Sequence, residues 1–203
     1  MKPATAHEPL SHAPGARRAF GAHRAVLAVV PLLLPESEIR LPGLCQKLEE
    51  LFGMTTRVHA GGFDPSSALD PSRGQYNSRA LLEMLLHEAR PEAARVLGVG
   101  GIDLFVPVLS YVFGEAELDG RVAVVSTHRL EPERYGLPPD PQLSAARLLK
   151  EATHELGHTF GLVHCREPDC VMHSSTYVEE IDLKLARFCP RCDFRRRAPA
   201  KGR

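Results

Sequence analysis

The feature that most constrains this chain is a pair of histidines on one long predicted helix, residues 143–162. His154 and His158 are four positions apart, so they project from the same helix face and can bind one metal ion together. Glu155 directly follows the first histidine, so its carboxylate can reach a water on that ion without being a ligand. The pair therefore predicts a metal site with a general base beside it.

The next residues complete the expected ligand set. Gly161 can adopt a left-handed backbone at low steric cost, which would end the helix and turn the chain back. His164 then approaches from outside the helix as the third ligand, and zinc would keep a fourth position open for water, as catalysis requires. A helix that merely carries surface histidines is the alternative, and the spacing disfavours it.

Four of the five cysteines form a second cluster immediately after these histidines. Their spacing suits a tetrahedral structural zinc that would clamp the C-terminal part, residues 165–193. Neighbouring side chains in an extended chain point to opposite faces, so Cys165 and His164 should serve different metals. A catalytic or regulatory dithiol formed by the last two cysteines is the alternative. The expected thiolate ligands are Cys165, Cys170, Cys189 and Cys192.

Charge and cysteine use limit the partners and the compartment. The chain has 203 residues with 25 Lys and Arg against 25 Asp and Glu, so global charge gives no basis for binding nucleic acid or anionic membranes. Clustered thiols indicate a reducing compartment. Arg17 and Arg18 precede an apolar run, 25–34, as in an export signal, but Pro31 interrupts the run and no cleavage site follows. We expect a cytoplasmic protein without a nucleic-acid or membrane partner.

Strand-like and helix-like segments alternate along the chain, which predicts an α/β layer fold. The connections after residue 102 are too short for helical crossovers, so one strand, with 111–113 as the candidate, should run antiparallel at the sheet edge. We expect a twisted mixed sheet of about five strands, a poorly ordered leader over 1–24 and a solvated basic tail over 194–203. Strands are expected at 25–34, 55–59, 102–106, 111–113 and 122–126, a loop at 61–74, and helices at 39–52, 78–88 and 143–162.

The histidine run resembles the metzincin clan of zinc peptidases, whose pattern His-Glu-x-x-His-x-x-Gly-x-x-His is matched at every fixed position. Met172 is the candidate for the clan's Met-turn, an apolar floor beneath the ligand histidines. With the four cysteines added, the sequence is similar to the archaemetzincin family over about residues 25–193. The resemblance implies a compact metzincin-like α/β domain with a catalytic zinc on three histidines and a structural zinc on four cysteines.

The expected activity is zinc-dependent hydrolysis of peptide bonds in a peptide or protein substrate, with Glu155 as general base. Two zinc ions per chain are expected. Ser174 stands where other metzincins place a switching tyrosine, so Tyr111 and Tyr177 are possible substitutes, although packing or rim positions are expected for both. An edge strand could bind the extended substrate through main-chain hydrogen bonds. The sequence does not predict an oligomeric state.

Two other classes of function remain open. One is a non-catalytic, zinc-organised interaction protein, against which Glu155 argues because a structural site needs no base. The other is a zinc-ribbon-like nucleic-acid module that uses the cysteines and the basic tail. Zero net charge and the lack of interleaved aromatic residues argue against it.

Overall fold

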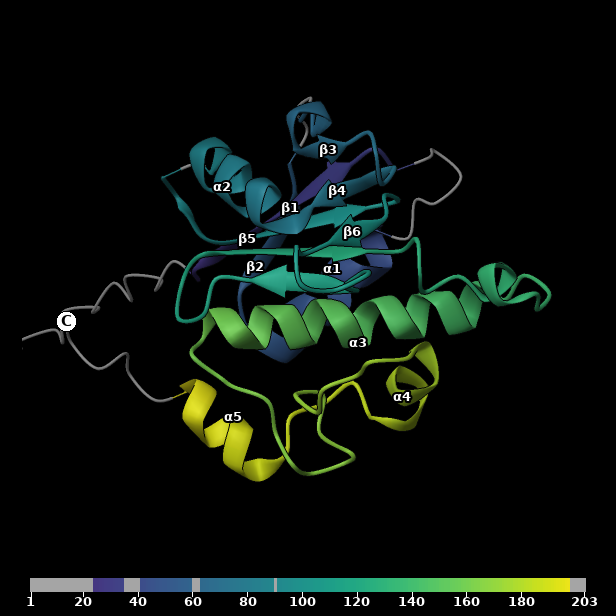
Figure 1. The fold of residues 1–203 in the computed structure, drawn as a ribbon. Helices are drawn as coiled ribbons and strands as arrows, with labels where there is room; N and C mark the ends of the chain where they lie inside the picture. Colours follow the sequence, from purple (N-terminus) through teal and green to yellow (C-terminus); the bar gives the residue numbers. More distant parts are fainter. Residues whose placement is uncertain (1–23, 35–40, 60–62, 90, 198–203) are drawn as a thin grey trace, which may run out of the picture.

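The computed structural model describes residues 24–34, 41–59, 63–89 and 91–197 and is built around one central sheet (Figure 1). Four strands run parallel, and the fifth runs antiparallel at the edge. The prediction of a mixed sheet of about five strands with one antiparallel edge strand is therefore confirmed. In order across the sheet the strands are β2 (Thr55–Val58), β1 (Val26–Leu32), β5 (Ala93–Gly100), β8 (Val122–Ser126) and β7 (Gly114–Ala116).

Helices cover both faces of this sheet (Figure 1). Helix α2 (Ser78–Glu88) packs on one face, and helices α1 (Leu41–Phe52) and α3 (Pro141–Thr159) pack on the other. In β5, Val96 faces α2, whereas its neighbour Leu97 faces α1 and α3. Because both faces are covered, β1 and β8 are continuous apolar runs rather than alternating ones.

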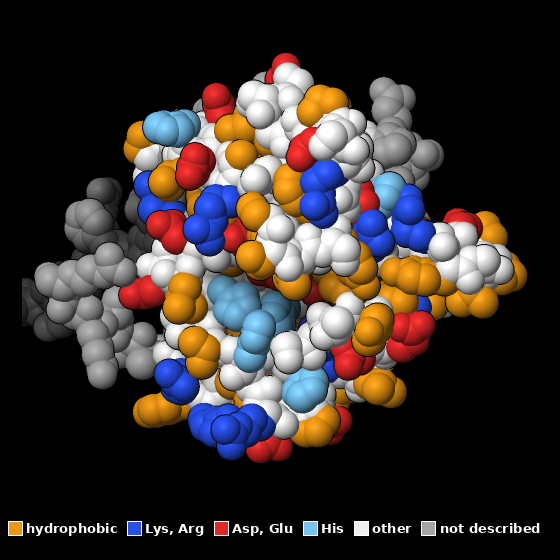
Figure 2. All heavy atoms as spheres, in the orientation of Figure 1, with side chains coloured by type: hydrophobic (Ala, Val, Ile, Leu, Met, Phe, Trp, Pro, Cys, Tyr) orange, Lys and Arg blue, Asp and Glu red, His pale blue; other side chains and the backbone are white. Residues whose placement is uncertain are grey.

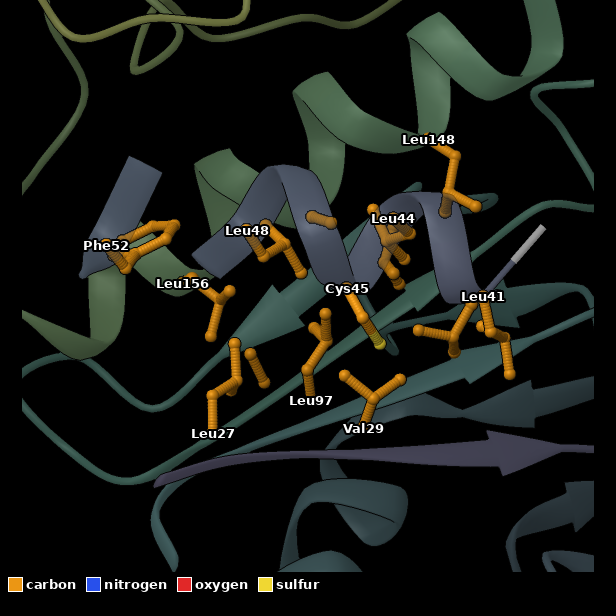
Figure 3. Packing of buried hydrophobic residues seen from close by; sticks show 14 of the residues in the cluster. Leu27, Val29, Leu41, Leu44, Cys45, Leu48, Phe52, Leu97, Leu148 and Leu156 are labelled. Carbon is orange, nitrogen blue, oxygen red and sulfur yellow. The ribbon is translucent and has the colours of Figure 1, made fainter. Parts of the chain in front are cut away.

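Cys45 lies on the buried side of α1, with its thiol directed toward the sheet (Figure 3). The same cluster includes Leu148 and Leu156 of α3, so the core positions the helix that carries the histidines (Figure 3). Helix α3 begins after Asp140, whose carboxylate accepts hydrogen bonds from the first-turn backbone. It is thereby fixed at its N-terminus and along its packed face.

The remaining elements are short. A separate three-stranded sheet has the order β3, β4 and β6, and two helices follow α3 and lie below it in Figure 1. None of the helices in the described ranges is long and apolar enough to cross a membrane. The bounds are β3 (Leu69–Asp70), β4 (Gln75–Asn77), β6 (Leu104–Phe105), α4 (Val178–Leu183), α5 (Pro190–Arg197) and the 3₁₀ turns η2 (Ser66–Ala68) and η3 (Pro132–Tyr135).

Several strands differ from the sequence prediction. The short strand β3 lies within the expected loop at 61–74, β4 was not expected, and the expected strand at 102–106 is only β6 of the small sheet. No strand was expected over 93–100, yet β5 is the middle strand of the sheet. Gly98 is needed in this strand because a Cβ there would lie 2.8 Å from the Cδ1 of Leu85. The edge strand is β7 and not 111–113, where Val112 makes only an isolated bridge to Leu104.

The predicted basic tail is partly wrong. Helix α5 continues to residue 197, and Arg196 is buried instead of solvated. Its guanidinium lies 5.3 Å from the ring of Phe52 and 5.1 Å from that of Phe188, and it pairs with Asp193 at 2.6 Å. Residues 198–203 and the predicted leader, except Arg24, lie outside the described residues.

Leu97→Ala is expected to lower the free energy of unfolding by about 2–5 kcal/mol, because it opens a cavity where β5 meets α1 and α3. Urea denaturation followed by circular dichroism measures this loss. Leu86→Ala is the matched control: it removes the same atoms from a side chain that is 41% exposed and should cost less than about 1 kcal/mol. Equal losses would contradict the central position of β5.

Candidate active site

The end of α3 and the turn after it bring the three predicted histidines together. Gly161 has a φ of 75°, the left-handed conformation that lets the chain reverse after the helix. The ring centroids of His154 and His158 are 4.7 Å apart, and His164 lies 5.3 and 5.1 Å from them. One ring nitrogen from each residue lies within 4.8 Å of the other two. The three imidazoles therefore converge on one point.

Carbonyl oxygens fix which nitrogen of each helix histidine faces that point. Nδ1 of His154 donates to the Val171 carbonyl at 2.8 Å, and Nδ1 of His158 donates to the Leu162 carbonyl at 2.7 Å. A carbonyl can only accept, so each neutral ring carries its proton on Nδ1 and an unshared pair on Nε2. Burial is the main cause that lowers the pKa of His154, His158 and His164, which keeps all three neutral.

The resulting donor set fits zinc. The two Nε2 atoms of His154 and His158 are 3.1 Å apart with lone pairs facing, an arrangement that is repulsive unless a cation lies between them. Two nitrogens on a tetrahedral zinc, with bonds of about 2.0–2.1 Å, are separated by about 3.3 Å. Neutral imidazoles with their other nitrogen held by a carbonyl are the usual state of zinc-binding histidines. The residues present therefore suit this metal.

Glu155 lies beside the histidines with its carboxylate in a buried position. Burial, followed by the charge of Glu151, raises its pKa well above the usual range of a glutamate. The edge strand approaches closely, since a Cβ on Gly114 would lie 2.6 Å from the Cγ of Glu155. A larger residue at the start of β7 would therefore displace this carboxylate.

These groups open onto a cavity of about 380 Å³. Histidine side chains gather in a hollow on the face shown in Figure 2, with hydrophobic side chains along its rim. One wall comes from the segment before and into β7, the floor from α3, and the other wall from the segment before α4. The lining residues are Leu109, Ser110, Tyr111, Val112, Phe113, Gly114, Glu151, His154, Glu155, His164, Ser174, Ser175, Thr176 and Tyr177.

Met172 packs directly against α3 beneath the histidines. It is fully buried, and a Cβ on Gly157 would overlap its Sδ. The carbonyl of the preceding residue, Val171, holds His154, so this segment supports the site through both packing and hydrogen bonding. The backbone N–H of Cys165 donates to the Met172 carbonyl at 2.9 Å and connects the segment to the second cluster.

The four C-terminal cysteines are also brought together. Their sulfurs lie within 4.8 Å of one another, and all five cysteines are free. The Sγ atoms of Cys165 and Cys189 are 3.9 Å apart, close to the value of about 3.8 Å expected for a tetrahedral zinc with bonds of about 2.3 Å. Although burial opposes ionisation, hydrogen bonds from the Glu167 backbone and Arg191 lower the pKa of Cys165 to about 7.

Comparison with known proteins decides the family. Residues 37–196 match the profile of Peptidase family M54. The archaemetzincin of Methanocaldococcus jannaschii is 43% identical over 150 residues, which cover 73% of this chain and 80% of that protein. The chain belongs to peptidase family M54. It is therefore a zinc metallopeptidase, a hydrolase that acts on peptides or proteins.

Solved structures agree with this assignment. The crystal structure of the archaemetzincin from Methanopyrus kandleri superposes with a TM-score of 0.74 at 38% identity, covering 86% of this chain and 94% of that one. A zinc-dependent peptidase from Methanocorpusculum labreanum gives 0.73 at 29% identity, covering 83% and 99%. The predicted resemblance to the archaemetzincins is confirmed, and so is the predicted metzincin-like α/β fold.

The other polar residues near the site of this M54 peptidase have mixed positions. Ser174, Tyr111 and Tyr177 all line the cavity. The hydroxyl of Tyr111 donates to the Thr176 carbonyl at 3.0 Å and so joins the two walls. His173 is turned away, with Nδ1 donating to the Cys165 carbonyl at 3.0 Å.

Sequence reasoning missed a buried ion pair in the peptidase. Glu151 and Lys184 are 4% and 1% exposed, and their Oε1 and Nζ atoms are 2.8 Å apart. Glu151 precedes Glu155 by four positions, so helical spacing could have placed it on the same face. Nothing in the local sequence distinguishes Lys184 from a surface lysine, because its partner comes from a distant helix.

Gly157→Ala is expected to lower both the free energy of unfolding, by about 1–3 kcal/mol, and zinc affinity at the histidines, because the new methyl group displaces Met172. Thermal denaturation and zinc titration with a competing chelator measure the two effects. Gly43→Ala, also in a helix but with nothing within 4 Å of the added Cβ, should leave both unchanged or raise stability slightly. Identical behaviour of the two variants would contradict the assigned contact.

Proposed function

We propose that this peptidase hydrolyses peptide bonds with one catalytic zinc on His154, His158 and His164 and with Glu155 as the general base. A second, structural zinc is proposed on Cys165, Cys170, Cys189 and Cys192. The observation that carries the proposal is the convergence of three neutral imidazoles at one end of a cavity that Glu155 also lines. A purely structural histidine site would need neither the cavity nor the carboxylate.

Each side chain has a distinct task in this scheme. When bound, zinc supplies Lewis acidity, which polarises the scissile carbonyl and acidifies the attacking water. Glu155 accepts the proton of that water on a carboxylate oxygen and then delivers it to the nitrogen of the departing amine. The Val171 and Leu162 carbonyls keep the two helix imidazoles in the tautomer that offers Nε2. Glu155 is thus the only group in the scheme that moves a proton.

The edge strand offers a way to hold the substrate. In the described sheet β7 pairs only with β8, so one of its edges is free, and it begins beside Glu155. An extended peptide can add to such an edge by main-chain hydrogen bonds. If it runs antiparallel to β7, the part after the cleaved bond lies along residues 109–113. This direction places the cavity beside the residue that follows the cleaved bond.

The cysteine site would act by stabilising the fold. Four thiolates satisfy a tetrahedral zinc completely and leave no position for water, so such a site contributes to folding and not to chemistry. N–H groups already point at the sulfurs, with Cys189 donating to Cys170 at 3.3 Å and Arg191 to Cys165 at 3.5 Å. Free, clustered thiols also support a reducing, cytoplasmic setting.

Glu155→Gln is expected to reduce kcat by about 10²–10⁴-fold on a peptide library while both metals stay bound, because only the proton acceptor is lost. Product formation by mass spectrometry and zinc by elemental analysis provide the two readouts. Glu83→Gln, a change of the same kind at an exposed position on α2, should match the parent. Unaltered turnover in Glu155→Gln would exclude the proposed base.

Elemental analysis is expected to find two zinc ions per chain in the parent and one in His158→Gln, with four thiols still protected from a thiol reagent. Cys170→Ser should lose the other ion and the protection, since three sulfurs no longer close the tetrahedron. Cys45→Ala is the control, because this thiol lies in the core between α1 and the sheet, and it should retain both ions. A single zinc in the parent would contradict the two-site proposal.

A further inference from the structure

The carboxylate of Glu151, which forms a buried pair with Lys184, can accept a further hydrogen bond from a group in the cavity. The ammonium lies behind the carboxylate: Lys184 does not line the cavity, and it also donates to the His173 carbonyl at 3.2 Å. Its Nζ lies 2.8 Å from Oε1 of Glu151. Glu151 itself lines the cavity, one helical turn before Glu155. The lysine therefore fixes the carboxylate in position from the side away from the cavity.

The Oε1 atom of Glu151 is buried and has no hydrogen-bond partner among the described residues, although Nζ of Lys184 lies 2.8 Å away, so the ion pair leaves its hydrogen-bonding capacity unused. A second polar atom in the same cavity, the Oγ of Ser175, is buried and also has no partner among the residues described. Buried acceptors are nearly always satisfied in folded proteins, and an unsatisfied one is costly. The cavity is therefore prepared for a ligand that donates hydrogen bonds.

The rest of the cavity selects the kind of donor. Its walls are apolar, from Leu109, Val112 and Phe113 on one side and the Tyr177 ring on the other. Its volume of about 380 Å³ is at the small end for ligand sites, which suits a side chain better than a large molecule. Apolar walls leading to a carboxylate fit a side chain with a methylene stem and a cationic end.

The nearby charges are compatible with this cation. Lys184 balances one negative charge, and Glu155, one helical turn from Glu151, is a second acidic side chain that lines the same cavity. Arg129, which stacks on Tyr111 at the rim, is already held by Asp103 through contacts of 2.6 and 2.7 Å. No unpaired cation among the described lining residues opposes a basic group at Glu151.

We propose that the cavity binds a lysine or arginine side chain of the substrate, with its cationic group donating to the carboxylate of Glu151. With the antiparallel orientation given above, this is the residue that directly follows the cleaved bond. The inference rests on the proposed function for its place in the reaction, and it makes the enzyme selective for basic residues at that position.

The test compares peptides that differ at this one residue: lysine against norleucine, and arginine against citrulline. Norleucine and citrulline keep the methylene stem of their partner but carry no charge. The ratio of kcat/KM for each pair is measured within one enzyme preparation, so incomplete folding cancels. Lysine and arginine are expected to be preferred by about 10-fold or more, as for a charge-assisted hydrogen bond in a buried site. The preference should fall to within about 2-fold in Glu151→Gln.

Because Glu151→Gln leaves a buried ammonium unpaired, the double variant Glu151→Gln with Lys184→Met is tested beside it and should show the same loss of preference. Glu88→Gln, an exposed site at the end of α2, should retain the parent ratio. Equal cleavage of both members of each pair by the parent, or an unchanged ratio in both Glu151 variants, would overturn the proposal.

Binding separates this inference from the proposed function. The zinc-loaded Glu155→Gln variant is titrated with fluorescently labelled forms of these peptides. The lysine peptide should bind about 10-fold more tightly than the norleucine peptide. If no peptide is cleaved by the parent but the affinity difference is present, the hydrolytic proposal fails and the cavity assignment stands. Equal affinities would overturn the assignment whatever the turnover.

Discussion

Two neutral imidazoles whose Nε2 atoms lie 3.1 Å apart repel each other unless a cation lies between them. The protein must therefore hold His154 and His158 in place before any metal arrives. It does so with the Val171 and Leu162 carbonyls, which bind the outer nitrogens, and with Met172, which fills the space against Gly157. These supports all come from the chain that follows α3, and this segment is in turn attached to the core.

Three contacts attach this C-terminal segment to α3 and to the layer of α1. Helix α4 is held by Arg147, whose guanidinium makes contacts of 2.6 and 2.8 Å with Asp182. Helix α5 is held by its own Arg196, whose guanidinium lies near the rings of Phe52 and Phe188. Because Phe52 belongs to α1, this contact joins the C-terminal part to the helix layer on the sheet. The buried pair of Glu151 and Lys184 is a third link. The site is thus positioned by ionic and aromatic contacts together with the apolar core.

The sequence was most informative where the constraint is local. Helical spacing predicts that His154 and His158 share a face, and Gly161 predicts the turn that returns His164. Runs of apolar residues likewise predicted β1, β8 and α2. In each case a few neighbouring residues determine the geometry.

Features that depend on distant partners were missed. The central strand β5 contains glycines because Leu85 and Leu32 pack close to its backbone, which no local pattern reveals. Lys184 and Arg196 resemble surface residues until Glu151 and two phenylalanine rings are placed beside them. The edge strand lies at 114–116, where only a glycine permits the close approach to Glu155. Tertiary packing decides all of these positions.

One peptide bond separates His164 from Cys165, so the two metal-binding clusters share a single rigid unit of backbone. A displacement of Cys165 would therefore move the backbone that carries the third imidazole. If both clusters bind zinc as proposed, thermodynamic linkage would make any coupling between them reciprocal, so that occupancy of either cluster would alter the affinity of the other for its ion. In that case an oxidant that attacks the thiols would lower the rate of hydrolysis without reacting with the proposed catalytic groups, which would couple turnover to the redox state of the surroundings.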